Sequence, residues 1–143
     1  MSALVAAEVV LASLLLLVLL VLAFVWLRRR IIADGGPLLM CALCTQAEPR
    51  WRLGLVRLTD DTLEWFSVVG PSVRPAYSWS RHHLDLASPE PLGDPIPGLP
   101  TDAVTVSGHC GPLPCGLALS PAASTTVRAW LESSPPGFNV NVA

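Results

Sequence analysis

The sequence predicts a transmembrane helix followed by one small α+β domain, in which antiparallel strands are closed by a single C-terminal helix. Three observations predict this class. An apolar block fills the N-terminal part of the chain. Short segments with an apolar residue at every second position follow it, separated by turn-forming residues. The last such segment instead places its apolar residues three and four positions apart, as in a helix. At 143 residues, the chain has room for one globular domain.

The apolar block runs from Val9 to Leu27 and is interrupted only by Ser13. A helix of this length covers about 28 Å, close to the roughly 30 Å of a bilayer's hydrocarbon core. A cleaved secretory signal would need a basic residue before the apolar run, and the sequence has none there. We therefore predict a membrane anchor over residues 1–30.

A basic cluster directly follows the apolar block and consists of Arg28, Arg29 and Arg30. The positive-inside rule predicts that this cluster stays in the cytoplasm, with the N-terminus outside and residues 31–143 inside. Binding of lipid headgroups is the alternative role, because each arginine gains about 1 kcal/mol beside an anionic leaflet. Dedicated lipid-binding clusters hold about four to eight basic residues, so topology is the preferred interpretation.

The folded domain is predicted over residues 51–137, after a juxtamembrane linker over residues 31–50. In its first strand, Trp51, Leu53 and Leu55 are expected on one face, with Arg52, Gly54 and Val56 opposite. An irregular loop is expected over residues 89–100, because it holds five of the prolines. The predicted strands cover residues 51–58, 63–69, 77–86, 103–107 and 116–120.

The C-terminal helix is predicted to begin after Ser120, which acts as the N-cap, with Pro121 at the first helical position. Its apolar face holds Val127, Trp130 and Leu131. The helix is expected to stop at Pro135-Pro136-Gly137, and residues 138–143 form a tail.

Short motifs along the chain resemble those of the actinobacterial membrane proteins of domain-of-unknown-function family 2550. The matching stretches are Trp51-Arg-Leu-Gly-Leu-Val-Arg57, Leu63-Glu-Trp-Phe66, Ser72-Val-Arg-Pro75 with Ser80-Arg81, and Trp130-Leu-Glu132 before Pro135-Pro136-Gly137. The resemblance implies a single-pass membrane protein with no assigned activity or catalytic residue. The order of strands and one closing helix is also similar to a pleckstrin-homology-type split barrel, whose relatives mostly bind lipids, peptides or proteins.

Two cysteine pairs are candidate metal ligands: Cys41 with Cys44, and Cys110 with Cys115. Four thiolates can hold a zinc ion tetrahedrally, although about 65 residues between the pairs is long for a compact site. A redox dithiol is the second alternative, but no basic neighbour is evident to depress a thiol pKa. Free, inert thiols in a reducing cytoplasm are the preferred interpretation. An inverted topology would favour disulfides.

Histidines offer little support for a metal site. Adjacent residues of a strand point to opposite faces, so His82 and His83 cannot share one ligand site, and His83 is expected beside Trp79 and Arg81. His109 next to Cys110 is the remaining candidate.

No catalytic site is predicted. Asp60-Asp61 is best explained as turn capping, and the sequence has neither a glycine-rich phosphate loop nor a recognisable Ser, His and acid set. We therefore predict a protein that is not an enzyme and needs no cofactor.

Aromatic residues are the best candidates for a binding surface. Trp65 and Trp130 are assigned to the core, because a sheet closed by one helix buries large side chains. Trp79, with Arg74 and Arg81, is the candidate partner surface.

The charge balance narrows the class of partner. Three of the nine arginines lie at positions 28–30, and one of the eleven acids, Glu8, precedes residue 31. Residues 31–143 therefore carry six arginines and ten acids. A mildly acidic domain is a poor binder of nucleic acid. The leading hypothesis is a noncatalytic, membrane-tethered binding or scaffold module for a membrane protein complex or lipid headgroups. The alternative is a zinc or thiol-redox membrane protein that uses the four cysteines.

Overall fold

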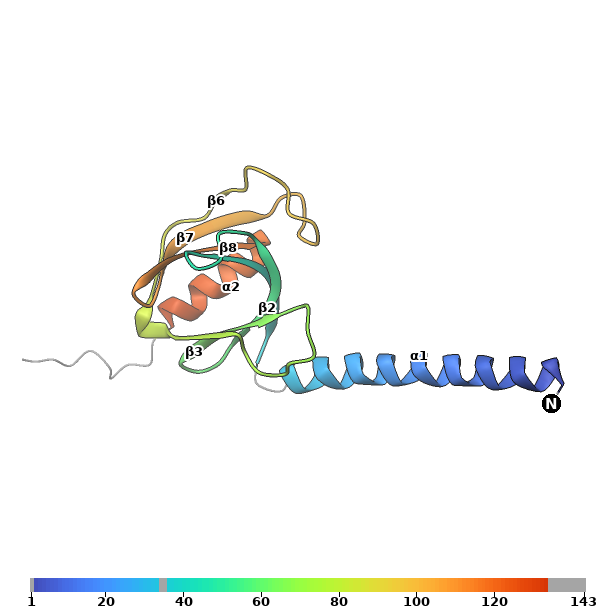
Figure 1. Ribbon diagram of the computed structural model, residues 1–143. Helices are drawn as coiled ribbons and strands as arrows, with labels where there is room; N and C mark the ends of the chain where they lie inside the picture. The colour runs from blue at the N-terminus through green and yellow to red at the C-terminus, as the bar shows by residue number, and fades with distance from the viewer. Residues whose placement is uncertain (1, 34–35, 134–143) are drawn as a thin grey trace, which may run out of the picture. The chain divides into compact units, whose positions relative to one another are not determined.

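A computed structural model describes residues 2–33 and 36–133 (Figure 1). The chain divides into two compact units, Met1–Asp34 and Gly35–Ala143, which are described separately. The expected stop at residues 135–137 and the expected tail at 138–143 lie outside the described residues.

The first unit is one helix, α1 (Ala3–Ala33), drawn in blue in Figure 1. It is the one helix among the described residues that is long and apolar enough to cross a membrane. Its apolar residues surround the whole helix, as expected for a segment solvated by lipid. The hydroxyl of Ser13 donates to the carbonyl of Val9 at 2.7 Å, so this polar group is satisfied within the helix.

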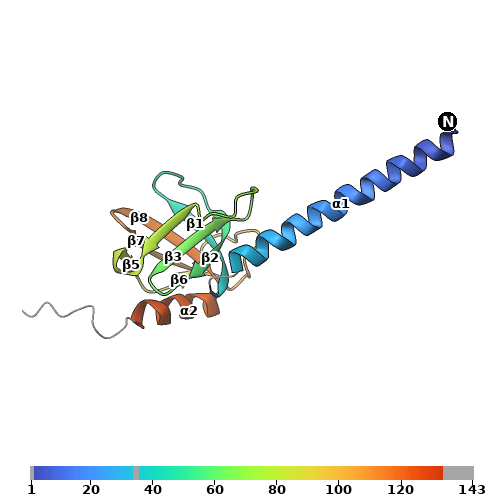
Figure 2. The same ribbon diagram turned by 90° about the horizontal axis from the view of Figure 1, so that it is seen from below.

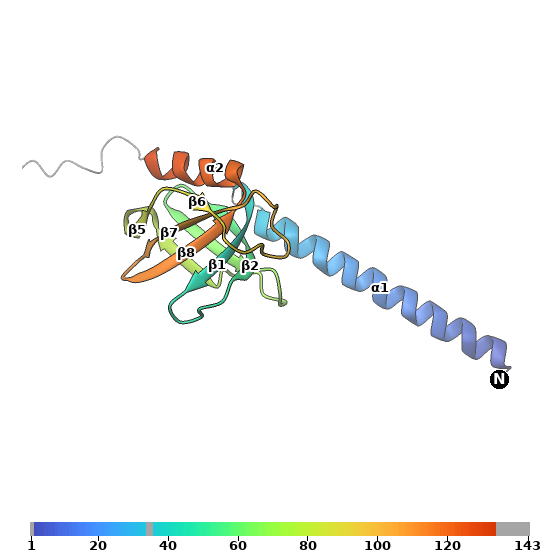
Figure 3. The same cartoon turned by 90° about the horizontal axis from the view of Figure 1, so that it is seen from above.

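The second unit is an antiparallel sheet that curls into a barrel, with one helix packed against it (Figure 2, Figure 3). Neighbouring strands follow the order β4-β3-β2-β1-β8-β7-β5, and β6 also pairs with β7. The strands are β1 (Leu38–Thr45), β2 (Arg52–Leu58), β3 (Thr62–Ser67), β4 (Tyr77–Ser80), β5 (Leu84–Leu86), β6 (Glu90–Pro91), β7 (Val104–Cys110) and β8 (Leu113–Leu119).

The prediction of a linker over residues 31–50 is wrong, because this stretch contains β1, and α1 extends to Ala33. β1 is a central strand that pairs with both β2 and β8. Three consecutive residues of it, Cys41, Ala42 and Leu43, are buried. A strand covered on both faces has no alternation of apolar and polar residues, so the periodicity could not reveal it.

The predicted first strand is confirmed as β2, but the buried face differs from the one expected. Gly54, Val56 and Leu58 are buried, whereas Leu53 and Leu55 are half-buried. The glycine lies against the ring of Trp65 on β3, so a side chain at this position would collide with the indole. The large ring therefore fills the space that Gly54 leaves.

The predicted strand over residues 77–86 is divided by a short 3-10 turn, η1 (Arg81–His83). β4 pairs with β3 and β5 pairs with β7, at opposite ends of the sheet, so the chain must turn between them. The backbone N–H of Arg81 donates to the carbonyl of Asp61 at 2.8 Å at this turn. The expectation that His83 shares a strand face with Trp79 and Arg81 is therefore wrong.

The remaining predictions of strands and helix are confirmed. β3 follows the predicted hairpin, and β7 and β8 form the second hairpin, in which Gly111 has a positive φ of 69°. The expected loop over residues 89–100 holds only the two-residue strand β6. Helix α2 (Pro121–Glu132) begins as predicted, because Ser120 Oγ accepts the N–H of Ala123 at 3.1 Å.

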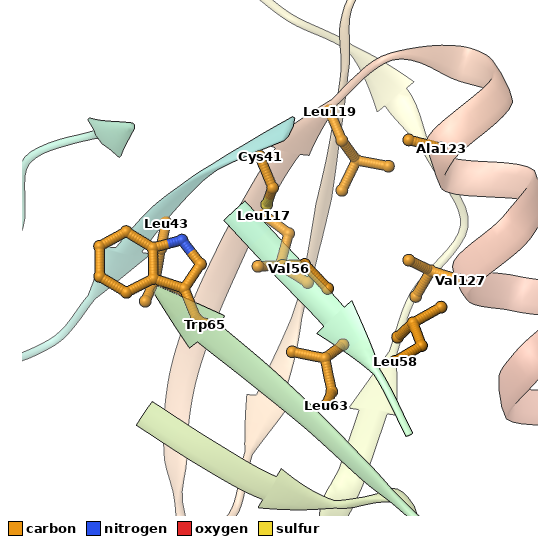
Figure 4. Packing of buried hydrophobic residues seen from close by; sticks show 10 residues of the cluster. All are labelled: Cys41, Leu43, Val56, Leu58, Leu63, Trp65, Leu117, Leu119, Ala123 and Val127. Carbon is orange, nitrogen blue, oxygen red and sulfur yellow. The ribbon is translucent and has the colours of Figure 1, made fainter. Parts of the chain in front are cut away.

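The core lies inside the barrel, between the sheet and α2 (Figure 4). Trp65 is fully buried, which confirms its assignment to the core. Val127 of α2 points toward Leu58 of β2 in Figure 4. Trp130 is only half-buried, and its indole N–H donates to the carbonyl of Thr59 at 2.7 Å. This bond ties the end of α2 to the β2–β3 hairpin.

Candidate functional site

A groove between β5 and α2 is the candidate ligand site. It encloses a cavity of about 260 Å³. Strands β5, β7 and β8 and helix α2 provide its apolar walls, which include Leu84, Leu86, Val106, Leu117, Val127 and Leu131. We refer to this feature as the β5–α2 groove. A concave, apolar site with a few polar groups at its rim is the usual form of a ligand site in proteins.

The rim of the groove carries charges of both signs. Arg128 and Glu132 of α2 form an exposed ion pair with a distance of 3.4 Å between Nε and Oε1. Asp85 and Arg81 add one further charge of each sign. These four charges sum to zero, so the rim does not favour an anionic headgroup over a neutral ligand.

The wall formed by β5 includes the backbone edge of the strand. Four consecutive residues, 84–87, line the groove. Because successive side chains of a strand point to opposite faces, a surface that contacts all four must wrap around the strand's edge. Among the described strands, β5 ends the hydrogen-bonded path of the sheet. An edge strand presents N–H and C=O groups that can pair with another strand.

Arg81 closes the groove at the end where α2 stops. Only 8% of this residue is exposed. Its guanidinium donates to the carbonyls of Asp60 at 2.6 Å and Ser133 at 3.1 Å, and lies 4.5 Å from the centre of the Trp130 ring. Its Nε–H is buried and has no hydrogen-bond partner among the described residues. The structure thus places one unused donor in a residue that lines the groove.

The predicted partner surface of Arg74, Trp79 and Arg81 is not one exposed surface. Arg81 is buried against Trp130, because its carbonyl partners fix it there. Trp79 is half-buried against the core and stacks on Tyr77 with 5.3 Å between ring centres. Of the three residues, only Arg74 is exposed.

The first cysteine pair cannot act as a dithiol or as two ligands of one ion in this structure. Cys41 and Cys44 are three positions apart on β1, so their side chains point to opposite faces. Cys41 lies in the core (Figure 4), where burial raises the pKa of its thiol, an effect opposed by a hydrogen bond with the backbone of Ala118. Cys44 is half-buried on the other face.

The second cysteine pair forms a disulfide, which corrects the preferred expectation of free thiols for this pair. Cys110 and Cys115 lie on the two strands of the β7–β8 hairpin, and their Cα atoms are 5.8 Å apart. This distance falls within the range of roughly 4.4–6.8 Å that a disulfide requires. The register sets Cys110 opposite Leu113 and Cys115 opposite Gly108, so the disulfide joins diagonal neighbours of the hairpin.

The zinc hypothesis is not supported by this geometry. The disulfide removes two of the four proposed ligands, Cys110 and Cys115, and the other two point apart. Residues 2–33 and 36–133 contain no group of three or more His, Cys, Asp or Glu side chains arranged to hold a metal ion. His82 lines the groove from η1, whereas His109 is exposed on β7.

The turn at Asp60-Asp61 serves a structural purpose through its backbone. Both carbonyls accept hydrogen bonds from Arg81, one from the guanidinium and one from the main chain. The side chain that caps this hairpin is that of Thr59, whose Oγ1 accepts the N–H of Thr62 at 3.0 Å. The described residues of the turn therefore offer no pair of carboxylates in a pocket.

The basic cluster lies in the last turns of α1. Arg29 and Arg30 are exposed, and Arg28 is half-buried. The guanidinium of Arg30 lies 5.3 Å from the centre of the Trp26 ring, a cation–π distance. Arginine and tryptophan together are typical of the interface end of a membrane span.

Sequence reasoning did not identify the β5–α2 groove. β7, β8 and α2 follow one another along the chain, but the remaining wall, β5, precedes them by 17 residues and has only three residues. The signal that was available is the charged pair on α2, Arg128 and Glu132, which lie one turn apart along one side of the apolar residues that face the sheet. It does not by itself distinguish a groove from an ordinary amphipathic helix.

The fold and the groove define a class: a pleckstrin-homology-like barrel with an apolar N-terminal helix. Two solved structures of Vav1, one inhibited by an allosteric inhibitor and one an apo form of the activated truncation, are similar to this chain. Their TM-scores are 0.50 and 0.51 and both are 12% identical. They match 72% and 71% of this chain but only 28% and 27% of the Vav1 chains, so the likeness shows the fold alone.

The chain belongs to the family of proteins of unknown function DUF2550, which matches residues 14–137. This confirms the resemblance seen in the sequence motifs. No curated protein matches the chain.

Proposed function

We propose that this protein is a noncatalytic, membrane-anchored binding module that holds an extended segment of a protein in the β5–α2 groove. The observation that carries the proposal is a groove that combines apolar side chains and polar groups in its lining with the edge of strand β5 in its wall. Strand addition at a sheet edge supplies affinity through the main chain, while pockets select alternate side chains.

Two features favour a protein segment over a lipid tail or a nucleic acid. An extended backbone brings a carbonyl that can accept the unused Nε–H of Arg81, and an acyl chain cannot do so. The groove's rim is electrically balanced, and the domain carries more acids than arginines, so nucleic acid is not an expected partner.

Helix α1 is the proposed anchor, and Arg28, Arg29 and Arg30 favour an orientation with the domain in the cytoplasm. The disulfide between Cys110 and Cys115 favours the opposite, oxidising side. We base the orientation on the arginines, because charge acts during insertion, before the hairpin exists. Anchoring raises the local concentration of the domain for partners in the same membrane, which compensates for a small binding site.

Site-specific photocrosslinking in cells tests the groove as the binding site. A photoreactive benzoylphenylalanine is placed at Arg128, which lines the groove, or at Ala129, which is exposed and does not. Position 129 is the matched control, because it lies one helical residue away. We expect adducts with another protein from position 128 that are absent from position 129.

A groove variant makes this experiment specific. Leu131→Arg places a charge among the apolar walls, and we expect it to reduce the adducts from position 128 about tenfold. Adducts of equal yield from both positions, or adducts that persist in Leu131→Arg, would contradict the proposal. Circular dichroism of the purified variant checks that the domain remains folded.

A further inference from the structure

We infer that the β5–α2 groove binds the free C-terminus of a partner protein, and that Arg81 receives the terminal carboxylate. The groove is that of the proposed function, on which this inference rests, and the chemistry of the ligand is the new element. Three features of the described residues carry it. They are a buried cation without a counter-ion, its position at one end of the groove, and the short length of the strand edge.

Arg81 is a buried cation that has no carboxylate partner among the described residues. Only 8% of the residue is exposed. Its guanidinium donates to the carbonyls of Asp60 and Ser133 and lies over the ring of Trp130. The ion pairs that the described residues form with carboxylates engage other arginines. Carbonyls and a ring leave the full positive charge uncompensated, whereas a buried charge is usually paired.

One donor of this cation is also unused. The Nε–H of Arg81 is buried and has no hydrogen-bond partner within residues 2–33 and 36–133. A buried donor without an acceptor is costly, and more so when it belongs to a charged group. Because Arg81 lines the groove, a ligand there lies beside this guanidinium. A carboxylate brings both the acceptor and the negative charge, whereas a backbone carbonyl brings only the acceptor.

The charges of the groove's rim are balanced in number but not in burial. Asp85, Arg128 and Glu132 are exposed, whereas Arg81 is buried. Solvent and salt screen exposed charges strongly and buried charges much less, so the end of the groove at Arg81 is positive. Asp85 and Glu132 on the same rim oppose a ligand of high negative charge. This combination suits one carboxylate better than a phosphorylated headgroup.

The position of Arg81 favours a chain terminus over an acidic side chain. Arg81 comes just before β5 in the chain, and the end of α2 lies at the same place, because the Ser133 carbonyl accepts from the guanidinium at 3.1 Å. A strand laid along β5 therefore meets the guanidinium at this end of the groove. With its carboxylate there, the strand runs antiparallel to β5, as do all neighbouring strands of the described sheet.

The groove has room for only the last few residues of such a chain. Its lining residues on α2 run from Ser124 to Glu132, which corresponds to about 12 Å along the helix axis. A strand advances about 3.4 Å per residue, so about four residues fit. Residues 84–87, which line the opposite wall, offer an edge of similar length. Main-chain pairing over so short an edge is weak, and the carboxylate adds affinity and fixes the register.

The test uses the full-length protein in lipid nanodiscs and a phage library that displays random C-terminal sequences with free carboxylates. Phage that bind empty nanodiscs are removed first. An enriched sequence is then synthesised as the free acid, as the C-terminal amide, and with Gly-Gly added after its last residue. We expect the amide and the Gly-Gly form each to bind about tenfold more weakly than the free acid. The amide lacks the charge, and Gly-Gly moves the charge past Arg81, whereas recognition of an acidic side chain would survive both changes.

Variants of the protein assign the carboxylate to Arg81. In Arg81→Gln we expect the affinity ratio of free acid to amide to fall from about tenfold to about twofold. Arg128→Gln is the matched control, because Arg128 also lines the groove but is exposed and paired with Glu132, and it should leave the ratio unchanged. The ratio compares two peptides on one protein, so a smaller folded fraction does not alter it.

Photocrosslinking locates the peptide. Benzoylphenylalanine is placed at Arg128 or, as the control, at Ala129, and the free acid carries a biotin at its N-terminus. We expect biotin-labelled protein from position 128 and not from position 129.

The outcomes distinguish this inference from the proposed function. Weaker binding of the amide and of the Gly-Gly form, with a ratio that falls only in Arg81→Gln, supports the inference. No enriched sequence, a free acid that binds no better than either altered form, a ratio that Arg81→Gln leaves unchanged, or equal labelling from positions 128 and 129 would overturn it. If Arg81→Gln does not fold, the three peptides and the crosslinks decide. Should adducts with another protein form in cells from position 128 alone while acid and amide bind equally, the proposed function stands and this inference falls. If neither adducts nor bound peptides are found, both fall.

Discussion

Arg81 makes more long-range contacts in the domain than its sequence context indicates. It joins the carbonyl of Asp60, the carbonyl of Ser133 and the ring of Trp130, and so connects a hairpin to the end of α2. In the sequence it follows two half-buried aromatic residues and resembles a surface arginine. Nothing in the local pattern reveals partners that lie 21 and 52 residues away.

We predict that Arg81→Met destabilises the domain by about 2–4 kcal/mol, because the carbonyls of Asp60 and Ser133 each lose a charge-assisted hydrogen bond. Methionine keeps much of the apolar volume, so lost packing contributes less. Urea denaturation of the purified protein measures the change. Arg74→Met, at an exposed arginine, is the control and should change the free energy of unfolding by less than about 0.5 kcal/mol. Equal effects of both substitutions would contradict this role.

Cys41 predicts a dependence of stability on alkaline pH. Burial raises the pKa of its thiol above the ordinary value of 9.0. The unfolded chain therefore loses this proton at a lower pH than the folded chain, so the contribution to stability is present below pH 9.0 and is lost as pH rises above it. We expect the free energy of unfolding to fall between about pH 8 and about pH 10.5, and to fall less in Cys41→Ala. Cys44→Ala is the control, and a pH dependence that disappears only in that variant would refute the assignment.

At the scale of elements, segments with a regular spacing of apolar residues could be predicted from the sequence. Strands β2 and β7 and helix α2 show the expected periodicity, and Ser120 caps α2 as predicted. β3 and β8 were also predicted as strands, although Trp65 and Phe66 of β3 and residues 117–119 of β8 are buried consecutively. β1 was missed because it is buried on both faces and therefore looks like an apolar stretch without a period. The groove was missed for a different reason. It is formed by the packing of α2 beside β5, and a local sequence pattern does not show which elements pack together.

Gly54 provides a test of how β2 and β3 fit together. A Cβ at this position would collide with the ring of Trp65 and the carbonyl of Phe66. We expect Gly54→Ala to destabilise the domain by about 1–3 kcal/mol through overpacking. Thermal unfolding followed by circular dichroism measures the effect. Gly93→Ala is the matched control, because a Cβ added there would meet no atom within 4 Å. Similar melting temperatures for the two variants would show that the strands can separate at little cost.

At the scale of the whole molecule, two chemical signals disagree about which side of the membrane holds the domain. Arg28, Arg29 and Arg30 favour the cytoplasm, whereas the Cys110–Cys115 disulfide favours an oxidising compartment. Labelling of single introduced cysteines with a membrane-impermeant maleimide decides between them. Val69→Cys reports on the domain, because Val69 is 85% exposed, and Ser2→Cys reports on the start of α1. Each is introduced into a chain whose native cysteines are replaced by alanine.

We expect Ser2→Cys to be labelled in intact cells and Val69→Cys only after permeabilisation, because the arginines resist transfer across the membrane. In that case the cytoplasm should keep Cys110 and Cys115 of the native chain reduced, and trapping of thiols at lysis will detect both. The reverse labelling would place the domain outside. The disulfide would then be a permanent brace of the β7–β8 hairpin, and partners for the β5–α2 groove would have to be sought on that side.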